Sequence, residues 1–390
     1  MEIKKLKIKE FAEVISGSTP KTNIEEYWNG EFSWITPAEI KEDSKYIFNT
    51  SRTLTKEGIN SCSLRELRKN TVLLTSRAPI GKVAIVGKAM YCNQGFKNLI
   101  CNENIVNPEY IYYWLSSQTE YLNSLGRGAT FKEISKKIVE DIEIPIPELD
   151  NQNKIVEILK KSEKLIDKRK EQIEALDELV KSQFIEMFGD VISNKKNYPI
   201  KKLDEITSII TDGTHQTPTY VDKGYIFLSS KNVTTGKINW DDVKYIPEEL
   251  HIKLNKRLEP KLNDILLAKN GTTGVAALVD RECIFDIYVS LALIRFNSNI
   301  NPVFMLYMIN SDGCRHQFNS SLKGIGVPNL HLSEIRKTKV LLPPIELQNQ
   351  FADFVKQVDK LKFEMEKSLK QLEDNFNSLM QRAFKGELFN

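Results

Sequence analysis

Side chains that could contact the bases and phosphates of a nucleic acid gather on a few loops rich in glycine, serine and threonine. Arginine suits the two acceptors of a guanine edge and asparagine suits adenine, whereas lysine and hydroxyl groups suit phosphate. In the first half of the chain the candidate DNA-contacting residues are Ser18, Thr19, Lys21, Thr36, Arg77, Lys82, Arg127, Thr130 and Lys132. In the second half they are Thr214, His215, Gln216, Ser230, Lys231, Lys269, Asn270, Thr272, Lys323, Asn329 and His331.

No recognisable catalytic signature accompanies these loops. The sequence lacks the GxxxxGK[ST] phosphate-binding loop and the signatures of hydrolases and zinc proteases. Pro343-Pro344 is followed by Ile345 and Glu346, so it is not the Asn-Pro-Pro-aromatic element of adenine methyltransferases. The four histidines and five cysteines lack the paired spacing of a zinc site. We therefore expect a binding protein with no catalytic residue and no metal ligand.

The composition indicates the class of protein but does not identify its binding partner. A chain of 390 residues suits about two domains. The net charge of +3 is too small to identify a partner, so a nucleic acid would require the basic groups to gather on one face. No apolar run approaches the roughly 18 residues of a membrane span, and no signal-peptide core follows the first residues. We expect a cytoplasmic protein that does not contact a membrane, with its cysteines as free thiols.

Two long amphipathic helices separate the loops into two sets. The first is predicted to begin at Asp150 and to end before Gly189, and the second to begin near Leu347 and to end before Gly386. Apolar residues recur along both at steps of seven, which is typical of helices that pair. The seam residues are Leu159, Ile166, Ile173, Val180 and Met187 in the first helix, and Phe351, Val358, Met365, Leu372 and Leu379 in the second. We expect the two helices to pair as an antiparallel coiled coil.

The sequence is an internal duplication. Residues separated by 198 positions match in the segments that lead into the two long helices. The matching pairs are Gly128 and Gly326, Ile142 and Val340, Pro145 and Pro343, Leu149 and Leu347, and Gln152 and Gln350. The predicted domains are residues 1–148, a central helix at 149–190, a second domain at 191–344 and a C-terminal helix at 345–390. Because repeated apolar positions carry packing and loops carry specificity, the differing loop tips suggest two related modules that read different targets.

Each repeat is predicted to be of the α+β class, a mixed α/β domain with several short strands joined by polar loops. In the first repeat, residues 70–74, 83–86 and 90–100 read as strands, and Glu109 to Leu125 as a helix rich in aromatic residues. We expect these rings to fill the core between helix and sheet rather than to form a surface on which bases stack.

Short sequence motifs in both repeats together resemble those of the specificity (S) subunits of type I restriction-modification systems over essentially the whole chain. The residues that carry the resemblance are Gly17-Ser18-Thr19-Pro20, Tyr27-Trp28-Asn29-Gly30, Trp34-Ile35-Thr36, Asp212-Gly213-Thr214-His215, Asn263-Asp264-Ile265-Leu266-Leu267, Gly271-Thr272-Thr273-Gly274, and the exits Ile144-Pro145-Ile146-Pro147 and Leu342-Pro343-Pro344-Ile345. The exits depart from the family in lacking its common Glu-Gln pair.

The resemblance implies two target recognition domains, each reading half of a split, asymmetric DNA sequence. It also implies that the paired helices dock two methyltransferase (M) subunits, and that restriction (R) subunits join a larger complex. S-adenosylmethionine and ATP would then be bound by those partners, and this chain would bind no cofactor itself.

Two other classes of protein stay open on the sequence alone. An enzyme with an unrecognised nuclease or methyltransferase site would be supported by cleavage or methyl transfer by the purified chain alone. A coiled-coil scaffold whose domains bind other proteins would be argued against by binding to a DNA duplex at moderate salt.

Overall fold

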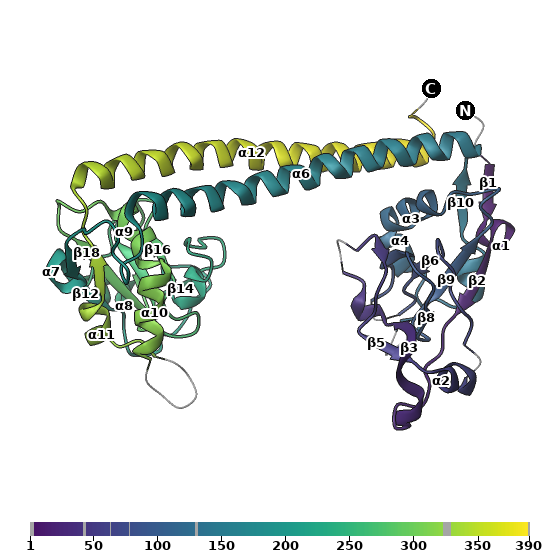
Figure 1. Cartoon of the computed structure of the whole chain (residues 1–390), viewed down its shortest axis with the longest axis horizontal. Coiled ribbons are helices and arrows are strands. Elements are labelled where there is room, and N and C mark those ends of the chain that lie inside the picture. Colours follow the sequence, from purple (N-terminus) through teal and green to yellow (C-terminus); the bar gives the residue numbers. More distant parts are fainter. Residues whose placement is uncertain are drawn as a thin grey trace. The chain divides into compact units, whose positions relative to one another are not determined.

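The computed structural model describes residues 4–41, 44–62, 64–77, 79–128, 132–322 and 329–388. The chain divides into two compact units, one of Met1–Lys170 with Lys367–Asn390 and one of Glu171–Glu366. Each unit contains one mixed α/β domain and about half of each long helix (Figure 1). The fold class predicted from the sequence is therefore confirmed.

The first unit is built around a central five-stranded sheet. Its described strands are β1 (Lys4–Lys7), β2 (Ala12–Ser16), β3 (Trp28–Ile35), β4 (Tyr46–Ile47), β5 (Arg52–Leu54), β6 (Val72–Leu74), β7 (Val83–Val86), β8 (Tyr91–Cys92), β9 (Lys97–Cys101) and β10 (Glu143–Ile146). Its helices are α1 (Ile8–Phe11), η1 (Glu25–Tyr27), η2 (Pro37–Glu39), α2 (Lys56–Ser61), α3 (Pro108–Ser117), α4 (Thr119–Ser124), α5 (Lys136–Glu140) and the start of α6 (Leu149–Phe188).

The strands of this domain form sheets with the orders β2-β9-β6-β7-β4, β5-β3-β8 and β1-β10. The helix α3 packs on β6 and β7. Its rings Tyr110, Tyr113 and Trp114 are buried in the core, as predicted. The helix predicted from Glu109 to Leu125 is two helices, α3 and α4, and Tyr121 of α4 is exposed. Burial rather than base stacking therefore explains the aromatic residues of α3.

The second unit repeats the plan. Its strands are β11 (Ile200–Lys202), β12 (Thr207–Asp212), β13 (Tyr225–Leu228), β14 (Lys244–Ile246), β15 (Ile265–Ala268), β16 (Ala276–Leu278), β17 (Phe285–Ile287), β18 (Leu291–Phe296) and β19 (Lys339–Leu341). Its helices are α7 (Leu203–Ile206), η3 (Ser230–Val233), α8 (Glu248–Asn255), α9 (Pro302–Ile309), α10 (Asp312–Ser320), α11 (Leu332–Lys337) and the start of α12 (Ile345–Lys385). The sheet orders β12-β18-β15-β16, β14-β13-β17 and β11-β19 match those of the first unit, except that β4 has no counterpart among the described residues.

The duplication is real, but its register at the long helices is 196 positions rather than the predicted 198. Gln152 accepts a hydrogen bond from the Asn107 amide and donates to the Pro147 carbonyl. Gln348 makes the same two bonds, with the Asn301 amide and the Pro343 carbonyl. Gln152 therefore corresponds to Gln348 and not to Gln350.

The strands that lead into the helices follow the same corrected register. The Ile8 amide donates to the Ile142 carbonyl, and the Leu203 amide donates to the Thr338 carbonyl, so Ile142 matches Thr338 and not Val340. The error has a simple cause. Ile144-Pro145-Ile146-Pro147 repeats every two residues, so a slip of two positions preserves the match of proline with proline.

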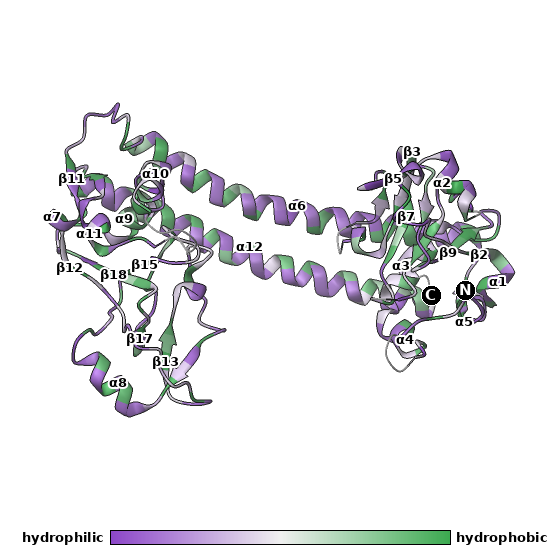
Figure 2. Ribbon diagram, turned by 90° about the horizontal axis from the view of Figure 1, so that it is seen from below, coloured by the Kyte–Doolittle hydropathy of each residue, from purple (hydrophilic) through white to green (hydrophobic). Residues whose placement is uncertain are grey.

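The two long helices run antiparallel. In the first unit the start of α6 packs with the end of α12, where Leu159 shares a core with Leu379 and Lys170 lies 3.5 Å from Glu373. In the second unit the end of α6 packs with the start of α12, where Val180 shares a core with Val358. Both helices are mostly hydrophilic with hydrophobic residues at intervals (Figure 2).

The predicted seam residues are all covered to some degree. Leu159, Ile166, Val180, Phe351 and Val358 are buried, and Ile173, Met187, Met365, Leu372 and Leu379 are partly buried. The heptad pattern missed further buried apolar residues, which include Ile155, Val156, Leu176, Phe184, Phe188, Val355 and Ala383. These widen the seam where each helix also contacts a domain core, because a helix covered on two sides needs more than an a/d stripe.

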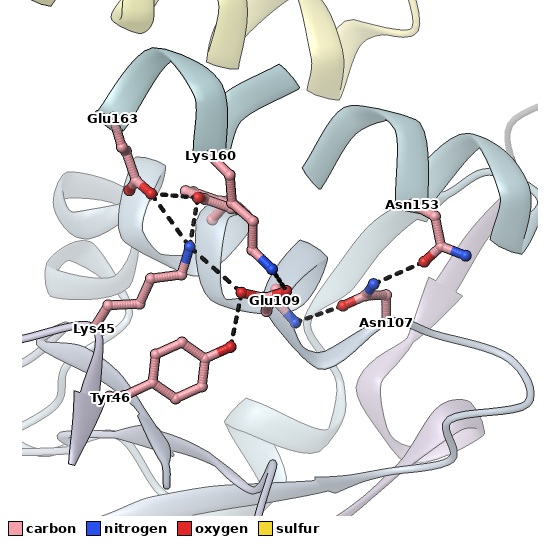
Figure 3. A network of polar contacts seen from close by, with 8 residues as sticks. Lys45, Tyr46, Asn107, Glu109, Asn153, Lys160 and Glu163 are labelled. Atoms are coloured by element: carbon pink, nitrogen blue, oxygen red, sulfur yellow. Dashed lines mark hydrogen bonds and ion pairs between the residues drawn. The ribbon is translucent and has the colours of Figure 1, made fainter. Parts of the chain in front are cut away.

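A polar network joins α6 to the domain of the first unit (Figure 3). Lys45 Nζ lies 3.2 Å from Glu163, and the Tyr46 hydroxyl donates to Glu109 at 2.7 Å. Burial opposes ionisation of Glu109, but hydrogen bonds from Lys160 and Tyr46 and the charge of Lys45 outweigh it and lower the pKa of Glu109. The carboxylate therefore stays charged and ties β4, α3 and α6 together.

The corresponding joint of the second unit is aromatic. Phe188 lies 4.7 Å from Phe304 and 5.7 Å from Phe351 between ring centroids, and Phe184 lies 5.3 Å from Phe351. Edge-to-face rings of this kind contribute about 0.5–1.5 kcal/mol per pair beyond their burial.

The register of the duplication makes a direct test possible. Gln348→Leu should lower the free energy of unfolding of the second unit by about 1–3 kcal/mol, because it leaves the partly buried Asn301 amide and the buried Pro343 carbonyl without this partner. Gln350→Leu, on the exposed side of the same helix, is the matched control and should change it little. Guanidinium unfolding of the two variants checks this, and an equal loss in both would contradict the 196-residue register.

Candidate nucleic-acid interface

Five loops in each unit carry the candidate residues or adjoin them. We name them loops A to E in chain order of the first unit. Their described residues in the first unit are 17–21 (A), 36–40 (B), 75–77 and 79–82 (C), 93–96 (D), and 126–128 and 132–134 (E). In the second unit they are 213–218 (A), 229–233 (B), 269–275 (C), 288–290 (D) and 329–331 (E). Thr130 and Lys323, both predicted contacts, lie outside the described residues.

Backbone hydrogen bonds fasten the loops of the first unit to one another. The Ser18 amide of loop A donates to the Cys92 carbonyl, immediately before loop D. The Ser76 amide of loop C donates to the Gly95 carbonyl of loop D, and the Ser76 carbonyl accepts from the Ile134 amide of loop E. The loops therefore adjoin one another at one end of the strands.

The second unit repeats the same circuit. The Thr214 amide donates to the Ile287 carbonyl, and the Lys269 amide donates to the Ser290 carbonyl. The Lys269 carbonyl then accepts from the Leu330 amide. One backbone arrangement thus presents two different sets of side chains.

A close approach of backbones requires glycine at the start of loop A. A Cβ atom on Gly17 would lie 2.1 Å from the Asn93 carbonyl oxygen, and one on Gly213 would lie 1.9 Å from the Ile287 carbonyl oxygen. Real Cβ atoms do not approach backbone so closely. The glycine therefore fixes how loop A lies against the end of the neighbouring strand.

Loop B is held by a capping box in both units. In the first unit the Thr36 amide donates to Glu39 at 2.8 Å, and Glu39 also accepts from the Ser51 amide at 2.7 Å. In the second unit the Ser229 amide donates to Asn232, which in turn donates to the Asp242 carbonyl. Thr36 was predicted to contact DNA. Its hydroxyl donates to Glu39 within the loop, and its contact with DNA stays a prediction.

A buried ammonium lies beneath the loops in each unit, but on different elements. In the first unit Lys97 of β9 lies 3.2 Å from Glu133 of loop E. In the second unit Lys269 of loop C lies 2.6 Å from Asp212, the last residue of β12. Lys269 was expected on the loop surface, whereas only 7% of its side chain is exposed. Its charge neutralises Asp212, so it holds loop C instead of meeting a ligand.

The other predicted residues differ in how far they reach the surface. Arg77 is partly exposed with its guanidinium 3.9 Å from Glu133, and the Lys82 ammonium donates to the Ile40 carbonyl at 2.8 Å. Exposed members are Lys21, Arg127, Lys132, His215, Gln216, Lys231, Thr272 and His331. Partly buried members are Ser18, Thr19, Thr214, Ser230, Asn270 and Asn329.

Sequence reasoning missed four residues that the loops bring into the site. Gln94 is hydrogen-bonded to Thr19, and the Tyr288 hydroxyl lies 3.3 Å from the Thr217 hydroxyl, which places loop D beside loop A in both units. Glu133 and Asp212 are the carboxylates that pair with the buried lysines. The turn Asn93-Gln94-Gly95 was visible in the sequence, but nothing in it indicated contact with loop A.

The thiols take no visible part in a site. Burial raises the pKa of Cys92, Cys101 and Cys314 to about 12, so these side chains are neutral thiols. Within the described ranges, no three His, Cys, Asp or Glu side chains are grouped as metal ligands would be. None of the helices in the described part of the chain has the length and apolar character needed to cross a membrane.

The chain combines a duplicated α/β domain, matching loops in both copies and two antiparallel helices. Comparison of the sequence with known protein families identifies the class of protein that has this arrangement. The model of the type I restriction modification DNA specificity domain matches residues 1–177 and 248–374. The chain belongs to this family. It is 30% identical to the type I restriction enzyme MjaIX specificity subunit of Methanocaldococcus jannaschii, over 98% of this chain and 92% of that protein.

Solved structures show the same fold. A chain from a structural study of the assembly and conformational transition of the type I R-M system has a TM-score of 0.62 at 17% identity, covering 99% of this chain and 98% of that one. The S subunit of a type I restriction-modification system from M. genitalium has a TM-score of 0.50 at 18% identity, covering 98% and 96%.

The buried ion pair of the second unit gives a stability prediction. Lys269→Met should destabilise this unit by about 3–5 kcal/mol, because it removes the buried ammonium 2.6 Å from the Asp212 carboxylate and leaves that carboxylate buried without this partner. A double variant with Asp212→Leu should recover most of that loss, since both charges are then gone. Thermal unfolding of the single and double variants measures this. Gln216→Ala, at an exposed side chain of the same loop cluster, is the control, and a double variant as unstable as the single one would contradict the pairing.

Proposed function

We propose that this chain is the DNA-recognition subunit of a type I restriction-modification complex and reads a bipartite, asymmetric target. The observation that carries the proposal is the repeated loop circuit, in which the backbone bonds of loops A, C, D and E recur while the side chains at the tips differ. A protein built to read two half-sites of different sequence needs this combination, because a common framework sets the approach and the tips set the bases read.

The side chains support different half-sites for the two domains. The first domain presents the guanidinium groups of Arg77 and Arg127, which suit guanine. The second presents Asn270 on loop C, the equivalent of the Arg77 loop, and His215 on loop A, and asparagine suits adenine. We take residues 1–148 and 191–344 as the two target recognition domains, with the helices at 149–190 and 345–390 as the parts that dock partners.

The proposed partners follow from family membership. Two methyltransferase subunits would dock on the long helices, and restriction subunits would join that complex. S-adenosylmethionine and ATP would be bound by those subunits, so this chain would supply recognition and not chemistry. Many of the exposed residues of α6 and α12 are charged, and these residues offer a docking surface that the seam does not use.

Methylome sequencing tests the proposed function. A host carrying this chain with its methyltransferase partner should acquire methylated adenines in a motif of two specified half-sites separated by unspecified bases. The same host with the methyltransferase alone is the control and should lack that motif. A single contiguous motif, or methylation that does not depend on this chain, would contradict the proposal.

Arg77 provides a residue-level test. If its guanidinium leaves Glu133 to pair with guanine, Arg77→Ala should weaken binding by about 1–3 kcal/mol and relax one half-site only. Binding to duplexes with single base changes in each half-site measures this. Arg65→Ala removes another exposed arginine of the same unit, paired with Glu13, and is the matched control. Equal weakening on every sequence would assign Arg77 to phosphate instead.

A further inference from the structure

Two cations occupy equivalent positions in the two units, in addition to the buried Lys97 and Lys269. Neither Arg52 nor Lys244 was among the candidate residues derived from the sequence. Arg52 begins β5 and lies opposite Trp34 in the antiparallel pair of β3 and β5. Lys244 begins β14 and lies opposite Phe227 in the antiparallel pair of β13 and β14. Each strand pair leads directly into loop B, so both cations lie beside that loop.

The parallel partner of each central strand fixes the equivalence. Ile35 of β3 pairs with Cys92, and Leu228 of β13 pairs with Ile287, the two residues whose carbonyls accept the loop A bonds. Trp34 therefore corresponds to Phe227, and their cross-strand partners Arg52 and Lys244 correspond to each other. The duplicated fold has kept a cation at this position while changing its type.

Aromatic rings support both cations. The Arg52 guanidinium lies 3.7 Å from the ring centroid of Trp28 and 5.1 Å from that of Trp34. The Lys244 ammonium lies 4.0 Å from the ring centroid of Tyr220, whose ring lies 6.1 Å from Phe227. A cation over an aromatic face gains about 0.5–1 kcal/mol at an exposed site, which limits the positions it samples.

The same tryptophans hold loop A. The Trp28 indole donates to the Lys21 carbonyl and the Trp34 indole donates to the Ser18 carbonyl, both at 3.2 Å. Arg52 therefore lies against the two tryptophan rings whose N–H groups position loop A. The cation is part of the loop cluster and not an isolated surface charge.

Arg52 and Lys244 differ in how they are neutralised from the three cations of the site that face carboxylates. Lys97 and Lys269 are buried against carboxylates, and Arg77 faces Glu133. Arg52 and Lys244 are exposed, and among the described residues no carboxylate lies within ion-pair distance of either. Their charge is available to an anionic ligand.

We propose that Arg52 and Lys244 are equivalent phosphate contacts, one for each half-site, held in place by the aromatic rings beneath them. Arginine and lysine share a positive charge but not the planar fork that reads guanine, so a position that accepts either requires charge and not base-edge geometry. This assignment rests on the proposed DNA-recognition function and adds the residues that anchor each domain to the backbone of its half-site.

The test measures the salt dependence of binding by the full chain with its methyltransferase partner. The probe is a labelled duplex carrying the motif found by methylome sequencing, titrated between about 50 and 200 mM salt. Arg52→Ala and Lys244→Ala should each reduce the slope of log affinity against log salt by about 0.9, the value for one lost phosphate contact. Each should weaken binding to the motif and to variants of it by the same factor.

Two exchanges and two controls sharpen the result. Arg52→Lys and Lys244→Arg should keep the wild-type slope, since each keeps the charge over the ring. Arg281→Ala removes a cation that also lies over an aromatic ring, 4.8 Å from Trp240, but at the end of β16 opposite the loops. Lys88→Ala removes an exposed lysine that follows β7. Both controls should leave the slope unchanged.

Several outcomes would overturn the assignment. An unchanged slope in Arg52→Ala and Lys244→Ala would show that neither cation meets phosphate. A loss confined to one base pair, or a loss of specificity in Arg52→Lys, would make the residue a base reader. If Arg52→Ala fails to fold, Lys244→Ala still decides the question in the other unit. Wild-type complex that does not bind its methylated motif would refute the proposed function itself.

Discussion

The apolar seam of each long helix has to be covered by the other, and the rest of the structure depends on this constraint. Neither helix can bury its seam against its own domain along its whole length. The first unit therefore takes Ala383 and Phe376 from the end of α12 into the core that surrounds Tyr110, and the second takes Phe184 from α6 into the core around Phe351. The first domain is completed by a segment from far along the chain, whereas the second is completed by the parts of the two helices that directly precede and follow it.

The two copies of the domain share the backbone arrangement of their loops but differ in the side chains at the loop tips. The glycine of loop A, the capping box of loop B and the circuit of backbone bonds recur in both units, while the buried ammonium has moved from Lys97 on a strand to Lys269 on a loop. Both units therefore keep one buried lysine, neutralised by a carboxylate, beneath the loops. Its location on the chain can change because either position reaches a carboxylate.

Much of the fold could be predicted from the sequence, because periodicity reports burial. The seven-residue step identified the helices, and the repeat identified the two domains. The register slipped by two at Ile144-Pro145-Ile146-Pro147, since local matches cannot distinguish equivalent prolines. The site was predicted less well. Whether Lys269 faces solvent or Asp212 depends on contacts between segments distant in sequence. Arg52 was missed for the same reason, because its aromatic support comes from another strand.

The division of the chain into units has a consequence for its synthesis on the ribosome. The second unit is one continuous segment, Glu171–Glu366, whereas the first needs Lys367–Asn390 in addition to Met1–Lys170. Chains are made from the N-terminus, and domains generally fold as units as they emerge. The domain that is translated first therefore receives its closing helix last, after the second has all its parts. Until then the apolar side of its growing α6, including Leu159, lacks its partner and has to be kept from other chains.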